Sequence, residues 1–334
     1  ASQTPPLAGT PTPQNPPMRP AFLRRLTGND ALAGIAAGLA VAVITAIWSV
    51  ATRFAVTTSL PPHDVTLIRF SVAAFFLWPV FLGSLRRYRQ TRPAALLLML
   101  GGAGVPFMWT AATGLTCAPV THIATLMIVM MPIFVTLISW LVFRETLAGR
   151  QLAGVATVVA GVVLISGSSL FLNRQAGEWV GDLMFLGASC LFATFTVTQR
   201  RSGLTPWQAT ALVNVGSTIL FLPVHLALPN SGIPNASLQE LAIQALAQGI
   251  GMALLGLYFY TVAVGRLGAQ RAAIFLALVP PFSTVLGMVF LDEQPSAIAL
   301  GGIVLVMVGV FAVVFCARQN GNGMVESALQ RRHG

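Results

Sequence analysis

The chain has 334 residues, of which 55% are apolar and only 8% are charged, whereas charged residues make up about a quarter of an ordinary soluble domain. A soluble core cannot bury so much apolar surface, so the composition excludes ordinary soluble enzymes and indicates a protein that crosses a membrane several times. The nineteen basic residues are all arginines and give a net charge of +10, but they lie in short clusters between apolar runs and not in a nucleic-acid-binding patch.

Residues 1–29 are rich in proline and contain no compact apolar run, which predicts a disordered cytoplasmic tail and no cleavable signal peptide. The first apolar run follows, and its Gly34 and Gly38 have a small-residue spacing that permits close helix contact. Each later run is also long enough to cross ~30 Å of hydrocarbon. We predict ten spans, at about 31–53, 65–85, 94–115, 118–143, 150–170, 180–199, 207–228, 241–262, 268–291 and 297–317.

The arginines between these runs define an orientation. If the N-terminal tail is cytoplasmic, sixteen of the nineteen arginines fall on the cytoplasmic side of the predicted spans. Only Arg53, Arg69 and Arg174 are left near the opposite side. A single missed span would scramble this bias, so both termini are predicted to be cytoplasmic.

An internal repeat organises the chain. Residues 121–154 recur without a gap 148 residues later, and the first two spans of each half align at an offset of 144. Because five spans is an odd number, the second copy must enter the membrane from the opposite side. The prediction is an all-α membrane protein with ten transmembrane helices in two inverted five-helix repeats, residues 30–172 and 173–317, followed by a cytoplasmic tail, 318–334.

The two hairpins that carry the repeat read P-I-F…F-R-E-T-L-A-G-R-Q-L-A-G and P-P-F…L-D-E-Q-P-S-A-I-A-L-G-G. They resemble the EamA-type members of the drug/metabolite transporter superfamily, over about residues 31–317. The resemblance implies a multi-pass protein of the bacterial inner membrane that exports amino acids or other metabolites. The chain departs from the family in its Pro-rich tail and in Asp292 beside Glu293.

Two prolines and two glutamates recur in the repeat. Pro132 and Pro280 remove a backbone hydrogen bond in mid-span, which predicts kinks that either gate the substrate path or serve packing. Glu145 and Glu293 end their spans, where each suits the N-terminal dipole of the helix that follows. We interpret both as structural caps, with proton carriage as the alternative.

Polar and aromatic side chains at membrane depth are candidates to line a substrate path. A buried polar group in hydrocarbon needs a partner, and aromatic side chains often anchor at the interface instead. The resemblance implies a cavity formed largely by spans 1, 3, 4, 6, 8 and 9. It therefore favours Trp48, Trp109 and Gln248 as path residues and disfavours Asn214. The candidates of this kind are Trp48, Trp109, Thr113, Gln248 and Tyr258.

Two titratable candidates complete the predicted path. Arg69 either reaches the external interface, pairs with Asp64, or holds a substrate carboxylate in two hydrogen bonds. His122 opens the fourth span near the external side, where it either senses protons or is a lone, solvated interfacial histidine. No Asp or Glu falls in the middle third of any predicted span, which argues against tight ion coupling through a buried carboxylate.

No metal, cofactor or catalytic site is predicted. The four histidines are scattered along the sequence, the three cysteines are widely spaced, and no phosphate-binding glycine loop occurs. The leading hypothesis is therefore a secondary transporter, an exporter or facilitator, whose partners are a small molecule such as an amino acid and the lipid bilayer. A non-transporting scaffold subunit and a lipid flippase or lipid-processing protein are the alternatives.

Overall fold

The computed structural model describes residues 28–143, 153–154, 156–164, 177–267 and 275–309, and these residues are helical apart from their connections. Seven helices in this part of the chain are long and apolar enough to cross a membrane, and two shorter apolar helices follow them. The predicted spans 150–170, 268–291 and 297–317 are only partly covered by the described residues, so the count of ten stays a prediction. The seven are Ala31–Thr58, Pro62–Gln90, Pro93–Cys117, Val120–Val142, Glu178–Ser202, Pro206–Ala227 and Leu238–Tyr260, and the two are Val279–Phe290 and Ala297–Gly309.

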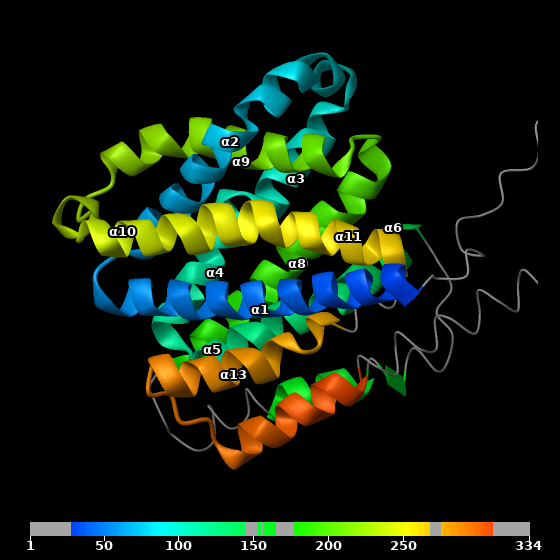
Figure 1. Ribbon diagram of the computed structural model, residues 1–334, viewed down its shortest axis with the longest axis vertical. Helices are drawn as coiled ribbons and strands as arrows, with labels where there is room; N and C mark the ends of the chain where they lie inside the picture. The colour runs from blue at the N-terminus through cyan, green and yellow to red at the C-terminus, as the bar shows by residue number, and fades with distance from the viewer. Residues whose placement is uncertain (1–27, 144–152, 155, 165–176, 268–274, 310–334) are drawn as a thin grey trace, which may run out of the picture.

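The helix boundaries follow from local chemistry. Helices α2 (Pro62–Gln90) and α9 (Pro206–Ala227) both begin at a proline, whose missing N–H costs nothing in a first turn. Thr205 adds a capping box, because its hydroxyl accepts the Gln208 N–H while the Gln208 side chain accepts the Thr205 N–H. The two helices occupy equivalent places in the repeat and pack against each other (Figure 1).

Helices α3 (Pro93–Ala103) and α4 (Val105–Cys117) together form the predicted third span, with a break at Gly104. The break has two causes. Pro106, the second residue of α4, has no N–H to donate to the carbonyl four residues earlier, so the helical hydrogen bonding cannot continue across Gly104. A Cβ at Gly104 would also lie 2.5 Å from the Ser217 hydroxyl oxygen of α9, so only glycine allows this approach.

The fourth and ninth predicted spans are both interrupted just before a proline. The fourth consists of α5 (Val120–His122), the π-helical segment η2 (Ile123–Val129) and α6 (Met131–Phe143), and Pro132 is the second residue of α6. Pro280 is likewise the second residue of α13 (Val279–Phe290). Thr136 and Thr284 each donate a hydrogen bond of 2.8 Å to the carbonyl of the proline four residues earlier. The local geometry of the repeat is thus reproduced in both halves.

The second half continues through α8 (Glu178–Ser202), α9, the short 3-10 helix η3 (Ile233–Asn235) and α10 (Leu238–Gln244). A second π-helical segment, η4 (Ala245–Gly256), then leads into α11 (Leu257–Leu267). Sequence patterns predicted a regular helix here. The π-helical register places Gln248 and Gly249 in the interior, and a Cβ at Gly249 would lie 2.3 Å from the Val72 side chain of α2.

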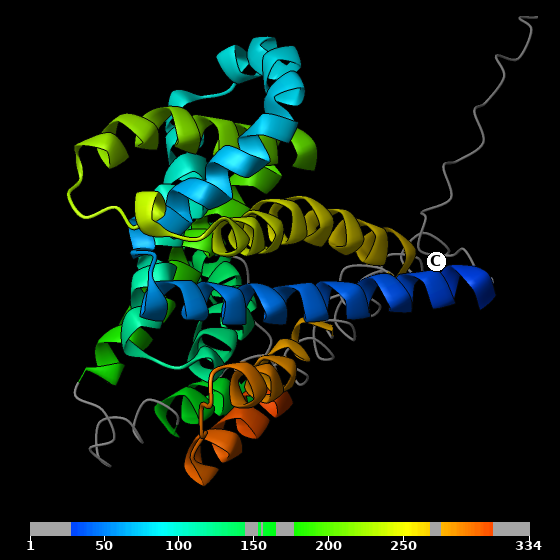
Figure 2. The same cartoon turned by 60° about the vertical axis from the view of Figure 1, so that its left-hand side comes forward.

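Each half packs its first helix against later helices of the other half. Helix α1 (Gly28–Thr58) lies along η4 and α11 and also contacts α13, as Figures 1 and 2 show. Helix α8 packs in the corresponding way on α3, α4 and α6. The predicted close contact at Gly34 and Gly38 is confirmed, because a Cβ at these positions would lie 2.6 Å from Leu267 and 2.4 Å from Phe275.

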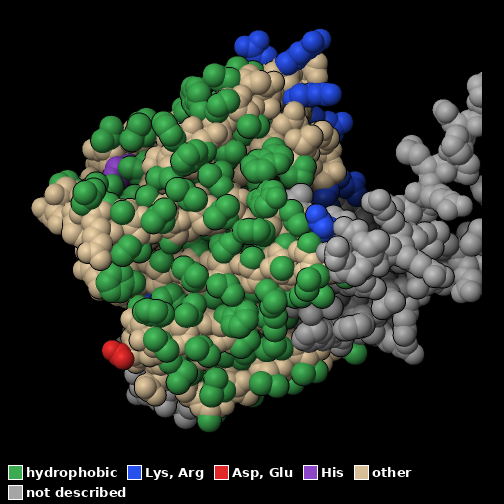
Figure 3. Space-filling view, viewed as in Figure 1, with side chains coloured by type: hydrophobic (Ala, Val, Ile, Leu, Met, Phe, Trp, Pro, Cys, Tyr) green, Lys and Arg blue, Asp and Glu red, His purple; other side chains and the backbone are tan. Residues whose placement is uncertain are grey.

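Charged side chains segregate to the two ends of this bundle. At one end, here called the Arg-rich end, exposed arginines lie in the last turns of α2, α8 and α11. In Figure 3 the basic side chains in view gather along one edge. At the other, here called the acidic end, lie the end of α1 and the starts of α2, α5 and α8. Six acidic side chains of the described residues also lie at the acidic end: Asp64, Glu178, Asp182, Glu240, Asp292 and Glu293.

Candidate functional site

A buried hydrogen-bonded cluster joins α1 to η4 inside the bundle. Trp48 is 2% exposed, and its indole Nε1–H donates to the Gln248 side-chain oxygen at 2.6 Å. The Gln248 amide nitrogen donates in turn to the Thr52 hydroxyl at 2.8 Å and to the Gln244 oxygen at 3.3 Å. The Gln244 amide donates to the Ala51 carbonyl at 2.8 Å. These partners satisfy polar groups that would otherwise be costly at membrane depth, and they fix the Trp48 ring.

Arg69 of α2 faces this cluster. Its guanidinium carbon lies 5.4 Å from the centroid of the Trp48 ring, within the range of a cation–π interaction. Among the described residues, no partner accepts a hydrogen bond from its buried Nε and Nη1 atoms. Arg69 stands seven residues into α2, roughly 10 Å from the helix start at 1.5 Å per residue. A cation with free donors at this depth is a ready site for an anionic group.

The alternative of an Arg69–Asp64 pair does not occur. Both carboxylate oxygens of Asp64 have other partners: Oδ1 accepts from the Ser231 hydroxyl at 3.0 Å and Oδ2 from the Gly232 N–H at 2.6 Å. Asp64 therefore ties the start of α2 to the connection after α9. This leaves Arg69 without a carboxylate partner among the described residues.

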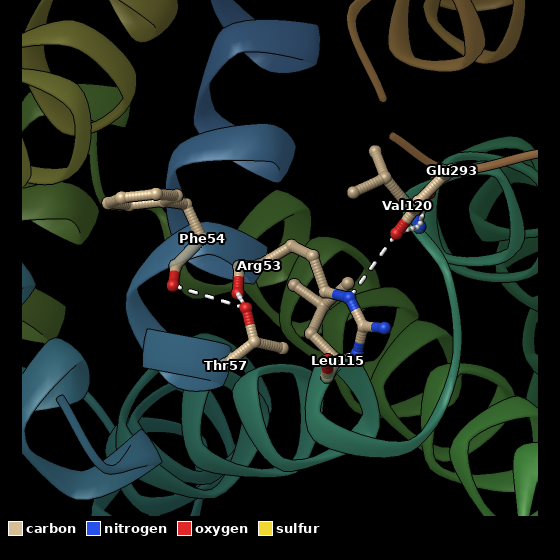
Figure 4. Close-up of polar contacts among 6 residues, drawn as sticks. All are labelled: Arg53, Phe54, Thr57, Leu115, Val120 and Glu293. Carbon is tan, nitrogen blue, oxygen red and sulfur yellow. Dashed lines mark hydrogen bonds and ion pairs between the residues drawn. The ribbon is translucent and has the colours of Figure 1, made fainter. Parts of the chain in front are cut away.

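A second polar contact lies at the acidic end (Figure 4). The Arg53 guanidinium donates from Nε to Glu293 Oε1 at 3.2 Å and also donates to the Leu115 carbonyl. Glu293 Oε2 accepts the Val120 N–H at 3.0 Å. The pair is largely buried, with side-chain exposures of 16% for Arg53 and 12% for Glu293. It joins α1, the start of α5 and the segment after α13.

Opposing effects act on the pKa of the Glu293 carboxyl. Burial raises the pKa of its carboxyl above the ordinary value of 4.5, while the Val120 N–H, the Arg53 charge and His122 each act to lower that pKa. The net pKa shift is upward, because burial is the largest effect. Beside the pair lies a cavity of about 400 Å³ whose lining also includes Thr121, His122, Glu178 and Asp292.

His122 is anchored next to this cavity. Its Nδ1 lies 2.7 Å from Asp182 Oδ1 of α8, and both side chains are almost fully buried. A carboxylate partner fixes the orientation of the imidazole and favours an N–H on Nδ1. His122, which sequence patterns left as a lone interfacial histidine, thus joins α5 of the first half to α8 of the second.

Comparison with known proteins gives this chain a family. The sequence profile of the EamA-like transporter family matches residues 32–167 and matches again over residues 179–315. The chain belongs to the EamA-like transporter family. It is a multi-pass membrane protein of two EamA repeats, from a family of transporters and not of enzymes.

Two relatives of this EamA-like chain are named as exporters of amino acids or their metabolites. The "Probable amino-acid metabolite efflux pump" of Escherichia coli K12 is 25% identical over 273 residues, which cover 78% of this chain and 88% of that protein. The "Probable terminal-alkyne amino-acid exporter" of Streptantibioticus cattleyicolor is 27% identical over 195 residues, or 57% of this chain and 63% of that protein. A chain of known crystal structure shares the fold with a TM-score of 0.59 at 22% identity, covering 87% of this chain and 98% of that one.

The structure brings some of the predicted path residues of this EamA-like protein together. Trp48, Arg69 and Gln248 meet in one cluster. Trp109 lies elsewhere, with its ring centroid 5.5 Å from Phe221 and 6.5 Å from His63. Tyr258 is 52% exposed and makes an edge-to-face contact with its neighbour Phe259, so its placement does not support a role in an internal path. Thr113 is partly buried in α4.

The predicted caps and kinks are placed as follows. Glu145 lies outside the described residues. Glu293 accepts from Val120 at the start of α5, whereas the helix after Glu293 is capped by Ser296, whose hydroxyl accepts the Ala299 N–H at 3.0 Å. The prolines stand at helix starts, as described above. Roles in capping and gating stay predictions.

Sequence reasoning missed three features of this site. The histidines were predicted to be scattered, which is wrong for His63 and His225, whose rings lie 5.4 Å apart beside Asp64. Arg53 was treated only as a topology signal, although it makes the ion pair with Glu293. Thr52 was also missed, although it follows Trp48 by four residues and therefore lies on the same face of α1. Its hydroxyl also donates a hydrogen bond to the Trp48 carbonyl.

Proposed function

We propose that this protein is a secondary transporter that exports small metabolites with a carboxylate, such as amino acids, by alternating access. One observation carries the proposal: the buried guanidinium of Arg69 has donors without described partners and lies over Trp48, where helices of both repeats meet. A carboxylate matches a guanidinium in two parallel hydrogen bonds. The names of the relatives support an amino-acid-like substrate.

The arrangement we propose has ten transmembrane helices in two inverted five-helix repeats, residues 30–172 and 173–317, with both termini cytoplasmic in the inner membrane. Three features support it. The EamA profile matches twice, α1 ends at the acidic end where α8 begins, and the exposed arginines lie at the other end. An excess of arginine marks cytoplasmic loops, so we assign the Arg-rich end to the cytoplasm.

This topology predicts that residues 145 and 293, which are equivalent in the repeat, face opposite sides of the membrane. Single cysteines placed at Glu145 and Glu293, in a chain without its native cysteines, should react with a membrane-impermeant thiol reagent from opposite sides. We expect the residue 145 cysteine to be protected in intact cells and the residue 293 cysteine to react. Labelling of both from the same side would exclude inverted repeats.

The contacts at the acidic end suggest how access alternates. The Arg53–Glu293 pair and the His122–Asp182 pair both join elements of different repeats there. We infer that these contacts close the external side, so that substrate reaches Arg69 from the cytoplasm. Opening outward then requires the Arg53–Glu293 pair to separate, and the breaks before Pro132 and Pro280 are the points at which their helices can bend.

Transport by the pure protein tests the proposal directly. We expect proteoliposomes that contain it to move radiolabelled amino acids faster than empty liposomes, with saturation and with exchange across the membrane. A panel of amino acids, their amides and their decarboxylated amines should separate carboxylate carriers from other substrates. If no amino acid or other carboxylate moves above the empty-liposome rate, a scaffold or lipid-handling role becomes the better hypothesis.

A further inference from the structure

A compact group of metal-ligating side chains lies at the acidic end, apart from the residues assigned to transport. It consists of His63 and Asp64 in the first turn of α2 and His225 in the last turn of α9, and we name it the His63–Asp64–His225 cluster. The Nε2 atoms of His63 and His225 lie 3.5 and 3.4 Å from the same oxygen, Asp64 Oδ1. One ligand atom from each residue falls within 4.8 Å of the others.

These separations match a tetrahedral site. Zinc bound to histidine nitrogen and carboxylate oxygen at about 2.0–2.2 Å, with tetrahedral angles, holds its ligand atoms about 3.3–3.5 Å apart. The two nitrogen–oxygen distances already have this value, and a small ring rotation brings the nitrogens within the same range. Two imidazoles and one carboxylate also suit zinc better than calcium or magnesium, which prefer oxygen ligands.

The surroundings hold the cluster in place. Asp64 is fully buried, and its second oxygen accepts the Gly232 N–H at 2.6 Å, while the Ser231 hydroxyl donates to Oδ1. Hydrogen bonds of this kind orient metal ligands in established sites. The buried His63 Nε2 atom, one of the proposed ligands, has no hydrogen-bond partner among the described residues. The His63 side chain is 13% exposed, which leaves a route of entry for an ion.

We propose that the His63–Asp64–His225 cluster binds one divalent transition-metal ion of the zinc class, with a water molecule or the Ser231 hydroxyl as fourth ligand. The ion joins the start of α2 to the end of α9, which are equivalent helices of the two repeats. If the proposed alternating access is right, a bound ion stabilises one arrangement of the repeats and slows transport from the external side. Binding itself does not depend on that function.

Zinc binding to the pure, tag-free protein in detergent, stripped with a chelator, tests the proposal. We expect one zinc ion per chain by competition with a chromophoric chelator, and a tetrahedral cobalt spectrum with intense visible bands when Co²⁺ replaces zinc. Changing an outer-shell partner typically weakens metal binding about 10- to 100-fold. The ligand variants His63→Asn and His225→Asn should therefore each weaken zinc binding at least ~10-fold.

Matched controls locate the site. His122→Asn removes a buried histidine outside the cluster, and His333→Asn removes one outside the described residues; both should leave zinc affinity unchanged. Zinc should also raise the thermal unfolding temperature of the wild-type protein, because binding to the folded state stabilises it, whereas magnesium at the same concentration should not. The thermal measurement needs no variant, so it still tests zinc binding if a histidine substitution prevents folding.

Three results would overturn the proposal: no stoichiometric zinc binding, unchanged affinity in both ligand variants, or equal thermal effects of zinc and magnesium. In any of these cases the cluster is a hydrogen-bonded network alone. Because the readouts are binding and unfolding, they stand apart from transport. Inhibition of amino-acid flux by external zinc, lost in His225→Asn, tests the link to transport separately.

Discussion

Replacing Arg69 by glutamine should abolish most transport of carboxylate substrates without destabilising the protein. A hydrogen bond to a charged group contributes about 1.5–3 kcal/mol, so losing the paired contact should reduce transport efficiency roughly 10- to 100-fold. The transport efficiency of Arg69→Lys should lie between those of wild type and Arg69→Gln, because an ammonium keeps the charge but cannot form two parallel hydrogen bonds with a carboxylate. Initial rates in proteoliposomes over a range of substrate concentrations measure both effects.

Stability distinguishes this role from a structural one. Because the Nε and Nη1 atoms of Arg69 have no described partner, the buried guanidinium contributes little to folding, and Arg69→Gln should unfold at the same temperature as wild type or higher. Arg92→Gln, which removes an exposed arginine at the Arg-rich end, is the matched control and should transport normally.

Substrate chemistry gives the sharpest version of this test. An amino-acid amide lacks the carboxylate, so wild type and Arg69→Gln should transport it equally slowly. Equal loss of amide and carboxylate transport would show that Arg69 supports the fold of the site and does not bind the carboxylate. Wild-type transport of carboxylates by Arg69→Gln would remove the main support for the proposed substrate class.

Removing Arg53 should destabilise the protein far more than neutralising its partner Glu293. Loss of one member of a buried ion pair typically costs 3–5 kcal/mol, and the residual exposure of this pair places Arg53→Gln near the lower limit, about 3 kcal/mol. Glu293→Gln should cost less than half of this, because the amide oxygen still accepts the Val120 N–H and burial already favours a neutral side chain. Thermal unfolding in detergent measures both costs.

The double variant provides the control. Arg53→Gln with Glu293→Gln removes both charges and should recover most of the stability lost in Arg53→Gln alone. Equal destabilisation by the two single variants, or no recovery in the double variant, would show that the pair does not stabilise the closed acidic end. Ser296 lines the cavity beside the pair. A cysteine introduced there should react faster with a membrane-impermeant thiol reagent when Arg53→Gln is also present.

The same pair predicts a pH dependence of stability with a definite sign. Because the folded protein raises the pKa of Glu293, its favourable contribution is complete below the ordinary value of 4.5 and is lost as pH rises through the raised pKa. The unfolding temperature of wild type relative to Glu293→Gln should fall over this interval and then level off. His122, Glu178 and Asp292 face the same cavity and are present in both proteins, so the comparison reports on the Glu293 carboxyl.

The duplication and the membrane class could be predicted from the chain because they depend on local pattern. Apolar runs of span length, prolines at equivalent places and arginines between runs are properties of short segments. The pairs Pro132 and Pro280, and Thr136 and Thr284, repeat their backbone geometry in the structure, as their common offset in the sequence implied. Gly34 and Gly38 likewise marked a close helix contact that the structure contains.

Other features escaped prediction because regular helices were assumed. The π-helical segments η2 and η4 change the register of two spans, and no propensity in their apolar sequences distinguishes them from α-helix. Gly104 carried a detectable signal in the proline two residues later, but the approach of Ser217 from α9 was not contained in it.

The sequence by itself determined the class, the repeat and the segregation of arginines. Only the tertiary structure decided which side chains meet: Arg53 with Glu293, 240 residues away, Trp48 with Gln248, 200 residues away, and Asp64 with Gly232, 168 residues away. In a soluble helix the apolar stripe shows which face is buried, but a membrane helix is apolar towards both lipid and protein. The rotation of each helix, and therefore the partners of its few polar groups, is set by packing between the two repeats.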